Sequence, residues 1–100
     1  MKTNFGYVYI LLCSNGNYYT GSTNDLGRRI DEHFNGDGSN YTRKYPPVEL
    51  VYFEEFQDVT EAFRREKQIQ GWNRSKKEAL IKNNQDKLPL LSKKKWRNQK

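Results

Sequence analysis

The sequence predicts a single α+β domain in which a three-stranded, largely antiparallel sheet is flanked by helices. With 100 residues, the chain is too short for two independent cores. Strand-like and helix-like segments follow in the order β-β-α-β-α-α, and the chain is too short for doubly wound βαβ units. Hydrophobic residues make up 34% of the chain and aromatic residues 14%, so a small core must depend on buried aromatic rings.

The strands are indicated by β-branched and aromatic runs of strand length. The first covers residues 7–12, the second residues 18–21 and the third residues 48–56. The connection between Gly36 and Pro47 is expected to be a loop, because consecutive prolines exclude helix at its end.

Three helices are expected from apolar residues that recur at helical spacing. In the first, Leu26, Ile30, His33 and Phe34 recur at this spacing. This helix begins at Thr23 or Asn24 and ends at Gly36, which suits a helix C-terminus. The other two open at capping boxes, in which a polar residue is followed three positions later by a glutamate. These two helices are expected at about residues 58–72 and 75–84.

The turn of the first hairpin decides where two tyrosines lie. A two-residue turn at Asn15 and Gly16 would place Tyr9 and Tyr19 on opposite faces of the hairpin. A three-residue turn, with Gly16 in the left-handed conformation, places Tyr9 opposite Gly21 and on the same face as Tyr19. We favour the second register, because it leaves a pocket over Gly21 beside two phenols.

The net charge of +6 is unevenly distributed. Basic and acidic residues cancel in residues 1–50, so the whole excess lies in residues 51–100. Such a surface attracts phosphate backbones and releases counterions on binding. A solvated lysine-rich face that only aids solubility would carry the same charge, so charge alone leaves both interpretations open.

The number of cysteines, the longest apolar segment and the basic C-terminal residues predict the cellular setting and the domain limits. Cys13 is the one cysteine, so neither an internal disulfide nor a zinc cluster can form, and a reduced cytoplasmic setting is expected. The longest apolar segment, residues 7–13, is far too short to span a bilayer, so no membrane partner is expected. Residues 1–88 are expected to form the domain and residues 89–100 a basic, flexible tail.

Three polar residues lie on helix faces that are otherwise apolar in pattern. Glu66 falls within a stripe of the second predicted helix, and a carboxylate there must be paired, hydrogen-bonded or bound to metal. A structural salt bridge to an arginine is the alternative to a metal site. Arg29 and His33 border the stripe of the first helix at i, i+4 spacing. The other members of the Glu66 stripe are Val59, Ala62, Phe63, Ile69 and Gln70.

Four segments together resemble a known family. They are Gly-Tyr-Val-Tyr-Ile-Leu at 6–11, Tyr-Tyr-Thr-Gly-Ser-Thr-Asn-Asp-Leu at 18–26, Arg-Arg-Ile-Asp-Glu-His at 28–33 and Arg-Arg-Glu-Lys-Gln-Ile-Gln-Gly-Trp at 64–72. In this order and spacing they resemble the GIY-YIG nuclease superfamily over about residues 5–85. The resemblance is to its small, uncharacterised stand-alone branch, which is similar to the N-terminal domain of an excinuclease and to homing endonuclease catalytic domains. Tyr7 stands where the family has the glycine that opens its first signature.

The resemblance implies a metal-dependent endonuclease that hydrolyses phosphodiester bonds of nucleic acid, with DNA favoured, using one Mg²⁺ or Mn²⁺ ion. Tyr9 would act as general base or position the attacking water, and Tyr19 would orient the substrate or the water network. Arg29 would contact the scissile phosphate, and His33 would assist proton transfer. Glu66 would be the one carboxylate that holds the metal.

Basic and aromatic residues outside this set are candidates for nonspecific, salt-dependent contact with nucleic acid. They are Tyr41, Arg43, Lys44, Arg74, Lys76 and Lys77. One alternative function is a nucleic-acid-binding module of the same fold with little turnover, since no separate DNA-binding domain is visible and a protein partner would then supply targeting. The other is a generic basic protein whose tyrosines are core residues. A monomer or weak dimer is expected.

Overall fold

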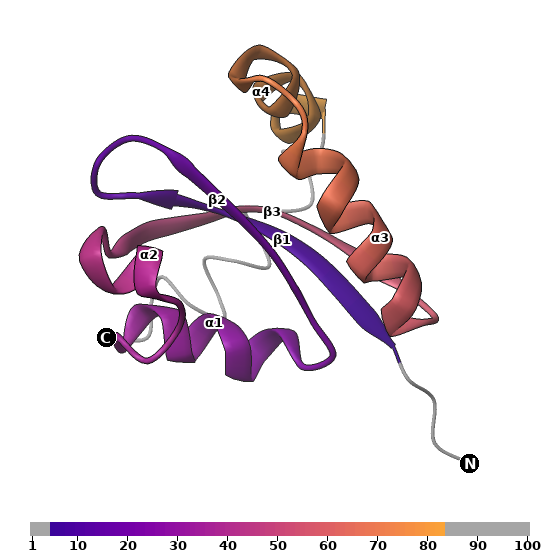
Figure 1. Ribbon diagram of the computed structural model, residues 1–100, viewed down its shortest axis with the longest axis horizontal. Coiled ribbons are helices and arrows are strands. Elements are labelled where there is room, and N and C mark those ends of the chain that lie inside the picture. Colours follow the sequence, from indigo (N-terminus) through magenta and orange to yellow (C-terminus); the bar gives the residue numbers. More distant parts are fainter. Residues whose placement is uncertain (1–4, 84–100) are drawn as a thin grey trace.

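A three-stranded sheet lies between helices on its two faces in the computed structural model, which describes residues 5–83 (Figure 1). The expected tail at 89–100, and residues 84–88 of the expected domain, lie outside this range. Within residues 5–83, no helix is long and apolar enough to cross a bilayer. In chain order the elements are β1 (Gly6–Cys13), β2 (Tyr18–Thr23), α1 (Leu26–Phe34), α2 (Asn40–Lys44), β3 (Pro47–Phe56), α3 (Val59–Gln70) and α4 (Arg74–Asn83).

The sheet has the order β2-β1-β3, and both strand pairs are antiparallel. The predicted fold class is therefore confirmed, with α2 added to the expected order. Because β1 is the central strand and both of its faces are covered, its sequence is a continuous apolar run. Strand β2 lies at an open edge, and the candidate functional residues gather at this edge.

The first hairpin has the three-residue turn that the sequence analysis favours. The amide of Cys13 donates to the carbonyl of Asn17 at 2.9 Å, and Gly16 has a φ of +86°. This register places Tyr9 directly opposite Gly21. The prediction that the two phenols share one face of the sheet is confirmed.

Two hydrophobic clusters cover the two faces of the sheet. One side is covered by α3 and the other by α1 and α2 (Figure 1). The cluster under α3 consists of Val8, Ile10, Tyr52, Ala62 and Ile69. The cluster on the α1 side consists of Tyr9, Leu11, Cys13, Leu26, Ile30 and Leu50. Alternate residues of β1 thus supply both cores.

The short helix α2 lies in the segment that the sequence analysis expects to be a loop. The Ser39 hydroxyl accepts a hydrogen bond from the amide of Thr42, and the Thr42 hydroxyl accepts one from the amide of Ser39. This is a capping box closed by threonine, in which the expected glutamate or glutamine is absent. The loop prediction was wrong because Pro46 comes after the end of this helix and does not prevent it.

The start of α4 also differs from the prediction. Asn73 caps the helix, since its side-chain oxygen accepts from the amide of Lys76. The predicted capping box at Ser75 and Glu78 is not formed. The carboxylate of Glu78 instead pairs with Arg74 of the preceding turn at 3.0 Å.

Two aromatic residues of the predicted apolar stripes are exposed. Phe34, the last residue of α1, is 39% exposed, and Phe63 on α3 is 52% exposed. On α3 the buried face is narrow, because only Ala62 and Ile69 are buried. Phe63 is rotated away from this face and lies under the ammonium group of Lys67.

Candidate active site

Tyr9 lies at the centre of a ring cluster on the α1 side of the sheet. Its side chain is 1% exposed, and its phenol passes over Gly21 of the edge strand. A β-carbon at position 21 would overlap the end of this phenol, so a glycine is required there. The Tyr9 ring centroid lies 6.5 Å from that of Tyr19 and 5.5 Å from that of His33.

A chain of buried hydrogen bonds connects this tyrosine to two helices. The phenol oxygen of Tyr9 lies 2.8 Å from Nε2 of His33 on α1. Nδ1 of the same imidazole lies 2.8 Å from Oγ1 of Thr42 on α2. His33 and Thr42 are each 1% exposed, so solvent does not complete these bonds. Gly38 packs closely against the imidazole and leaves no room for a side chain.

Burial controls the protonation of this pair. It raises the pKa of the Tyr9 phenol well above the usual value, although a hydrogen bond from Arg29 opposes the shift. Burial also lowers the pKa of His33 to about 4, and the positive charge of Arg29 acts in the same direction. At neutral pH both side chains are therefore uncharged, and the imidazole carries one proton.

Arg29 supplies the positive charge beside the phenol. Its Nη1 donates to Oε1 of Glu32 at 2.9 Å, one turn along α1. This bond is the main reason that the pKa of Arg29 is raised, with the contact to Tyr9 as a further contribution. Glu32 therefore holds the guanidinium next to the phenol, where it can donate to an oxygen but accept nothing.

Glu66 reaches the same edge strand from α3, on the other side of the sheet. Its Oε1 accepts from the hydroxyl of Ser22 at 2.5 Å, and its Oε2 accepts from the side-chain amide of Gln70 at 2.8 Å. Glu66 forms no ion pair within residues 5–83, so the salt bridge to an arginine is absent there. The carboxylate is half-buried and close enough to Tyr9 for its charge to act on the phenol.

The donor set at Glu66 fits a weakly bound hydrated ion. In the described part of the chain no three His, Cys, Asp or Glu residues are grouped for a metal. Each Glu66 oxygen accepts one hydrogen bond and has a lone-pair site to spare. Mg²⁺ commonly binds to one or two carboxylates and retains several waters, so a single carboxylate with open lone pairs is an acceptable ligand.

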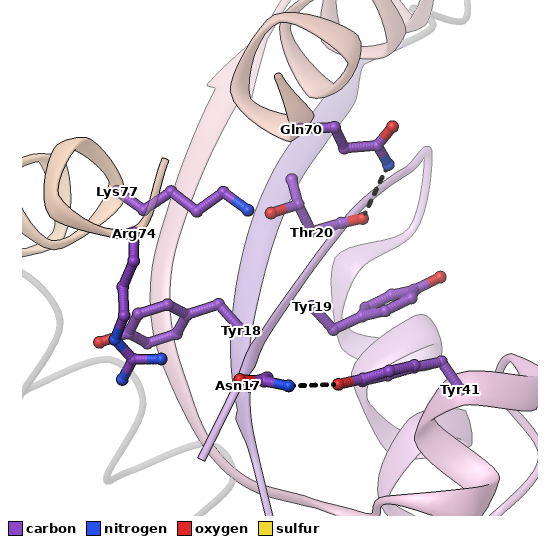
Figure 2. Close-up of a pocket in the computed structure, with 8 residues that line it drawn as sticks. All are labelled: Asn17, Tyr18, Tyr19, Thr20, Tyr41, Gln70, Arg74 and Lys77. Atoms are coloured by element: carbon purple, nitrogen blue, oxygen red, sulfur yellow. Dashed lines mark hydrogen bonds between the residues drawn. The ribbon is translucent and has the colours of Figure 1, made fainter. Parts of the chain in front are cut away.

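A groove of about 470 Å³ runs along the edge of β2 beside these residues (Figure 2). The hydroxyl of Thr20 is buried in its wall and has no hydrogen-bond partner among residues 5–83. Tyr41 stacks on Tyr19, with 6.0 Å between ring centroids and 17° between planes. The groove is lined by Asn17, Tyr18, Tyr19, Thr20, Tyr41, Gln70, Arg74 and Lys77.

Half of the six predicted nucleic-acid contacts lie on this groove, namely Tyr41, Arg74 and Lys77. The other three lie elsewhere. The ammonium group of Lys76 lies 4.4 Å from the centre of the Trp72 ring. Arg43 and Lys44 are exposed at the end of α2 and do not line the groove.

A family model described as the GIY-YIG catalytic domain matches residues 5–79, three quarters of the chain. The chain belongs to the GIY-YIG family. Within this GIY-YIG domain, Tyr9 lies opposite Gly21 and Tyr19 opposite Leu11, with 6.5 Å between the two ring centroids.

Relatives of this GIY-YIG domain include a UPF0213 protein of Halobacterium salinarum, 50% identical over 75 residues, which cover 75% of this chain and 97% of the relative. A UPF0213 protein of Haloquadratum walsbyi is 44% identical, covering 82% of this chain and 92% of the relative. The solution structure of the UPF0213 protein BH0048 from Bacillus halodurans is also similar. It has a TM-score of 0.53 and 42% identity, and the match covers 80% of this chain and 85% of that one.

All five residues predicted for the site of the GIY-YIG domain gather at the β2 edge, in two groups. On the α1 side Tyr9, Tyr19 and His33 are in mutual ring contact, with Arg29 at the phenol. On the α3 side lies Glu66. A generic core role for the tyrosines does not explain why a carboxylate and a guanidinium accompany them.

Three residues of the GIY-YIG domain that form hydrogen bonds with Glu66 or His33 were not predicted from the sequence. Ser22 and Gln70 hold the Glu66 carboxylate, and Thr42 holds the imidazole of His33. The side-chain amide of Gln70, which is expected in the apolar stripe, instead donates to Glu66 and to the carbonyl of Thr20. The i, i+4 spacing from Glu66 was the available signal, since residues four apart on a helix are neighbours.

Proposed function

We propose that this GIY-YIG domain is a metal-dependent endonuclease that hydrolyses phosphodiester bonds of nucleic acid, with DNA as the first substrate to test. The observation that carries the proposal is the position of Glu66. Its carboxylate is held at the edge of β2 by Ser22 and Gln70, within electrostatic reach of the buried Tyr9. A carboxylate, a guanidinium and a phenol at one strand edge match the needs of phosphate chemistry.

Attack on a phosphodiester gathers negative charge on the nonbridging oxygens and on the leaving oxygen. Arg29, held beside Tyr9 by Glu32, would contact the nonbridging oxygens. A divalent ion at Glu66 would neutralise the developing charge and lower the pKa of a bound water. The positions of these two groups on opposite sides of β2 suggest that the scissile phosphate lies at the edge of this strand.

Tyr9 would act on the attacking water while remaining neutral itself. Its raised pKa means that a standing phenolate is not available at neutral pH. The phenol oxygen can accept a proton from water as it passes its own proton to Nε2 of His33. One proton enters the phenol oxygen and one leaves it, so tyrosine stays neutral, the water becomes the hydroxide nucleophile and His33 becomes the imidazolium.

The groove beside the site supports nucleic acid as the substrate. Tyrosine rings offer stacking surfaces for bases, and Lys77 forms no ion pair within residues 5–83 and is available for a phosphate. The same groove is the one observation that favours the second candidate, a nucleic-acid-binding module with little turnover. Binding of this kind would be salt-dependent.

Nicking of supercoiled plasmid and cutting of single-stranded DNA, each in Mg²⁺ and in EDTA, test the proposal. A nuclease converts plasmid to the open-circular form, or shortens the single strand, in Mg²⁺ but not in EDTA. Gel-shift of the same DNA without any product in Mg²⁺ or Mn²⁺ would favour the binding module instead.

A further inference from the structure

The buried hydrogen bonds around Tyr9 have one direction that satisfies every group. The guanidinium of Arg29 lies near the phenol but has no acceptor atom, so it cannot receive the phenolic proton. The phenolic proton must then be donated elsewhere, and the acceptor within hydrogen-bond distance is Nε2 of His33 at 2.8 Å. An uncharged imidazole that accepts at Nε2 carries its proton on Nδ1.

On the other side of the imidazole, the hydroxyl oxygen of Thr42 can accept a hydrogen bond from the protonated Nδ1. Oγ1 of Thr42 lies 2.8 Å from Nδ1, and it also accepts from the amide of Ser39 at 3.2 Å. Its own hydroxyl has two acceptors on Ser39, the carbonyl oxygen at 3.3 Å and the hydroxyl oxygen at 3.1 Å. When Thr42 donates to either of them, its oxygen is left as an acceptor towards Nδ1 of His33. The chain of donors therefore runs from Tyr9 through His33 and Thr42 to Ser39.

We propose that Thr42, held by the capping box with Ser39, is a positioning residue that fixes His33 as the Nδ1-protonated tautomer, so that Nε2 accepts the proton of Tyr9. The opposite tautomer would donate from Nε2 to the phenol oxygen. The phenolic proton would then have no acceptor among the neighbouring groups of residues 5–83. Helix α2 thus has a role in the site through Thr42, which acts on the imidazole rather than on substrate.

The effect of Thr42 on cleavage rests on the proposed nuclease function. The tautomer of His33 does not depend on that function, because it is set by groups that are buried in the free protein. Thr42 also acts only through His33, so its removal should change the imidazole before it changes anything at the phosphate. The two claims can therefore be tested by separate readouts.

The test is ¹⁵N NMR of the His33 imidazole at neutral pH, in the wild-type protein and in two variants. In the wild type, Nδ1 should show the shift of a protonated nitrogen and Nε2 that of an unprotonated one. Thr42→Val removes the acceptor while keeping the shape, and the proton should move partly or wholly to Nε2. Thr42→Ser keeps a hydroxyl and should restore the wild-type pattern. If the valine variant does not fold, Thr42→Cys offers a near-isosteric, weaker acceptor and should give the same shift.

A wild-type protein with the proton on Nε2 would overturn the proposal without any substitution. So would a folded Thr42→Val protein with the wild-type tautomer. For cleavage, Thr42→Val should lower the rate by about tenfold or more, the order seen when an outer partner of a functional histidine is lost, and Thr42→Ser should recover it. The predicted tautomer in a protein that cuts no DNA would uphold the positioning role and refute the nuclease function.

Discussion

Nε2 of His33 lies 2.8 Å from the phenol oxygen of Tyr9, although 24 positions separate the two residues in the sequence. This contact links the central strand to α1 between two side chains that are each 1% exposed. It gives the phenolic proton a neutral acceptor. A tyrosine with a raised pKa can therefore take part in proton transfer without becoming a phenolate first.

Replacing Tyr9 by phenylalanine should remove this chemistry while keeping the ring in the core. The rate of DNA cleavage should fall by about 10²- to 10⁴-fold, the usual contribution of a general acid–base group. Tyr7→Phe is the matched control, because Tyr7 lies on the same strand and the same face but is not bonded to His33. Initial rates from plasmid nicking measure both. Equal rates for the two variants would exclude Tyr9 from the reaction.

Substitution of Gly21 should disturb the site through packing. In Gly21→Ala the new methyl group would collide with the end of the Tyr9 phenol. We expect a loss of about 1–3 kcal/mol in the free energy of unfolding, as for other overpacked cores, together with loss of cleavage. Gly27→Ala is the control, since a methyl group there meets open space on a helix. Urea denaturation should show Gly27→Ala to be unchanged or more stable, and a Gly21→Ala protein of wild-type stability would argue against the close approach.

The buried imidazole of His33 should make stability depend on pH. Burial, assisted by the charge of Arg29 and opposed by that of Glu32, lowers its pKa from 6.5 to about 4. Between these values the unfolded chain binds a proton that the folded chain does not, so the free energy of unfolding falls as the pH falls through this window. The full effect is about 3 kcal/mol and is reached below pH 4. Denaturation at several pH values should show a shallower dependence for His33→Gln, and parallel curves for both proteins would contradict the assignment.

Lys77 should contribute to nucleic-acid affinity without taking part in the chemistry. Lys77→Gln should weaken binding of any DNA sequence and reduce the slope of log K against log salt by about one. Lys67→Gln removes the same charge from α3 at a position outside the groove, where the ammonium group lies over Phe63. Fluorescence anisotropy over a salt series compares the two. A greater loss of DNA affinity in Lys67→Gln than in Lys77→Gln would show that the binding surface does not lie at the β2 edge.

The first hairpin shows which part of the candidate site can be predicted from the sequence. Its register could be predicted because Gly16 suits the left-handed position of a three-residue turn, and the turn sets which side chains share a face. From that register alone, Tyr9, Tyr19 and Gly21 could be placed together. Helical spacing brought Arg29 and His33 to the same face.

The polar partners could not be predicted in the same way, because they depend on tertiary contacts. Thr42 contacts His33 only because a short helix, which the sequence did not predict, turns the threonine of its capping box inward. Ser22 meets Glu66 across 44 positions of sequence, and no local pattern fixes that pairing. The prediction that Phe63 is buried was wrong for a different reason. A hydrophobic residue beside a narrow buried face can remain exposed to solvent.

The most direct measurement is Mg²⁺-dependent cleavage by Glu66→Gln beside Glu61→Gln, an exposed position on the same helix. The amide in Glu66→Gln keeps the size of the side chain but removes the charge that would hold the ion. We expect Glu66→Gln to be folded by circular dichroism and to lose cleavage in Mg²⁺ and in Mn²⁺, with Glu61→Gln cutting at the wild-type rate. A folded Glu66→Gln protein that nicks plasmid at the wild-type rate would contradict the assignment of the metal site.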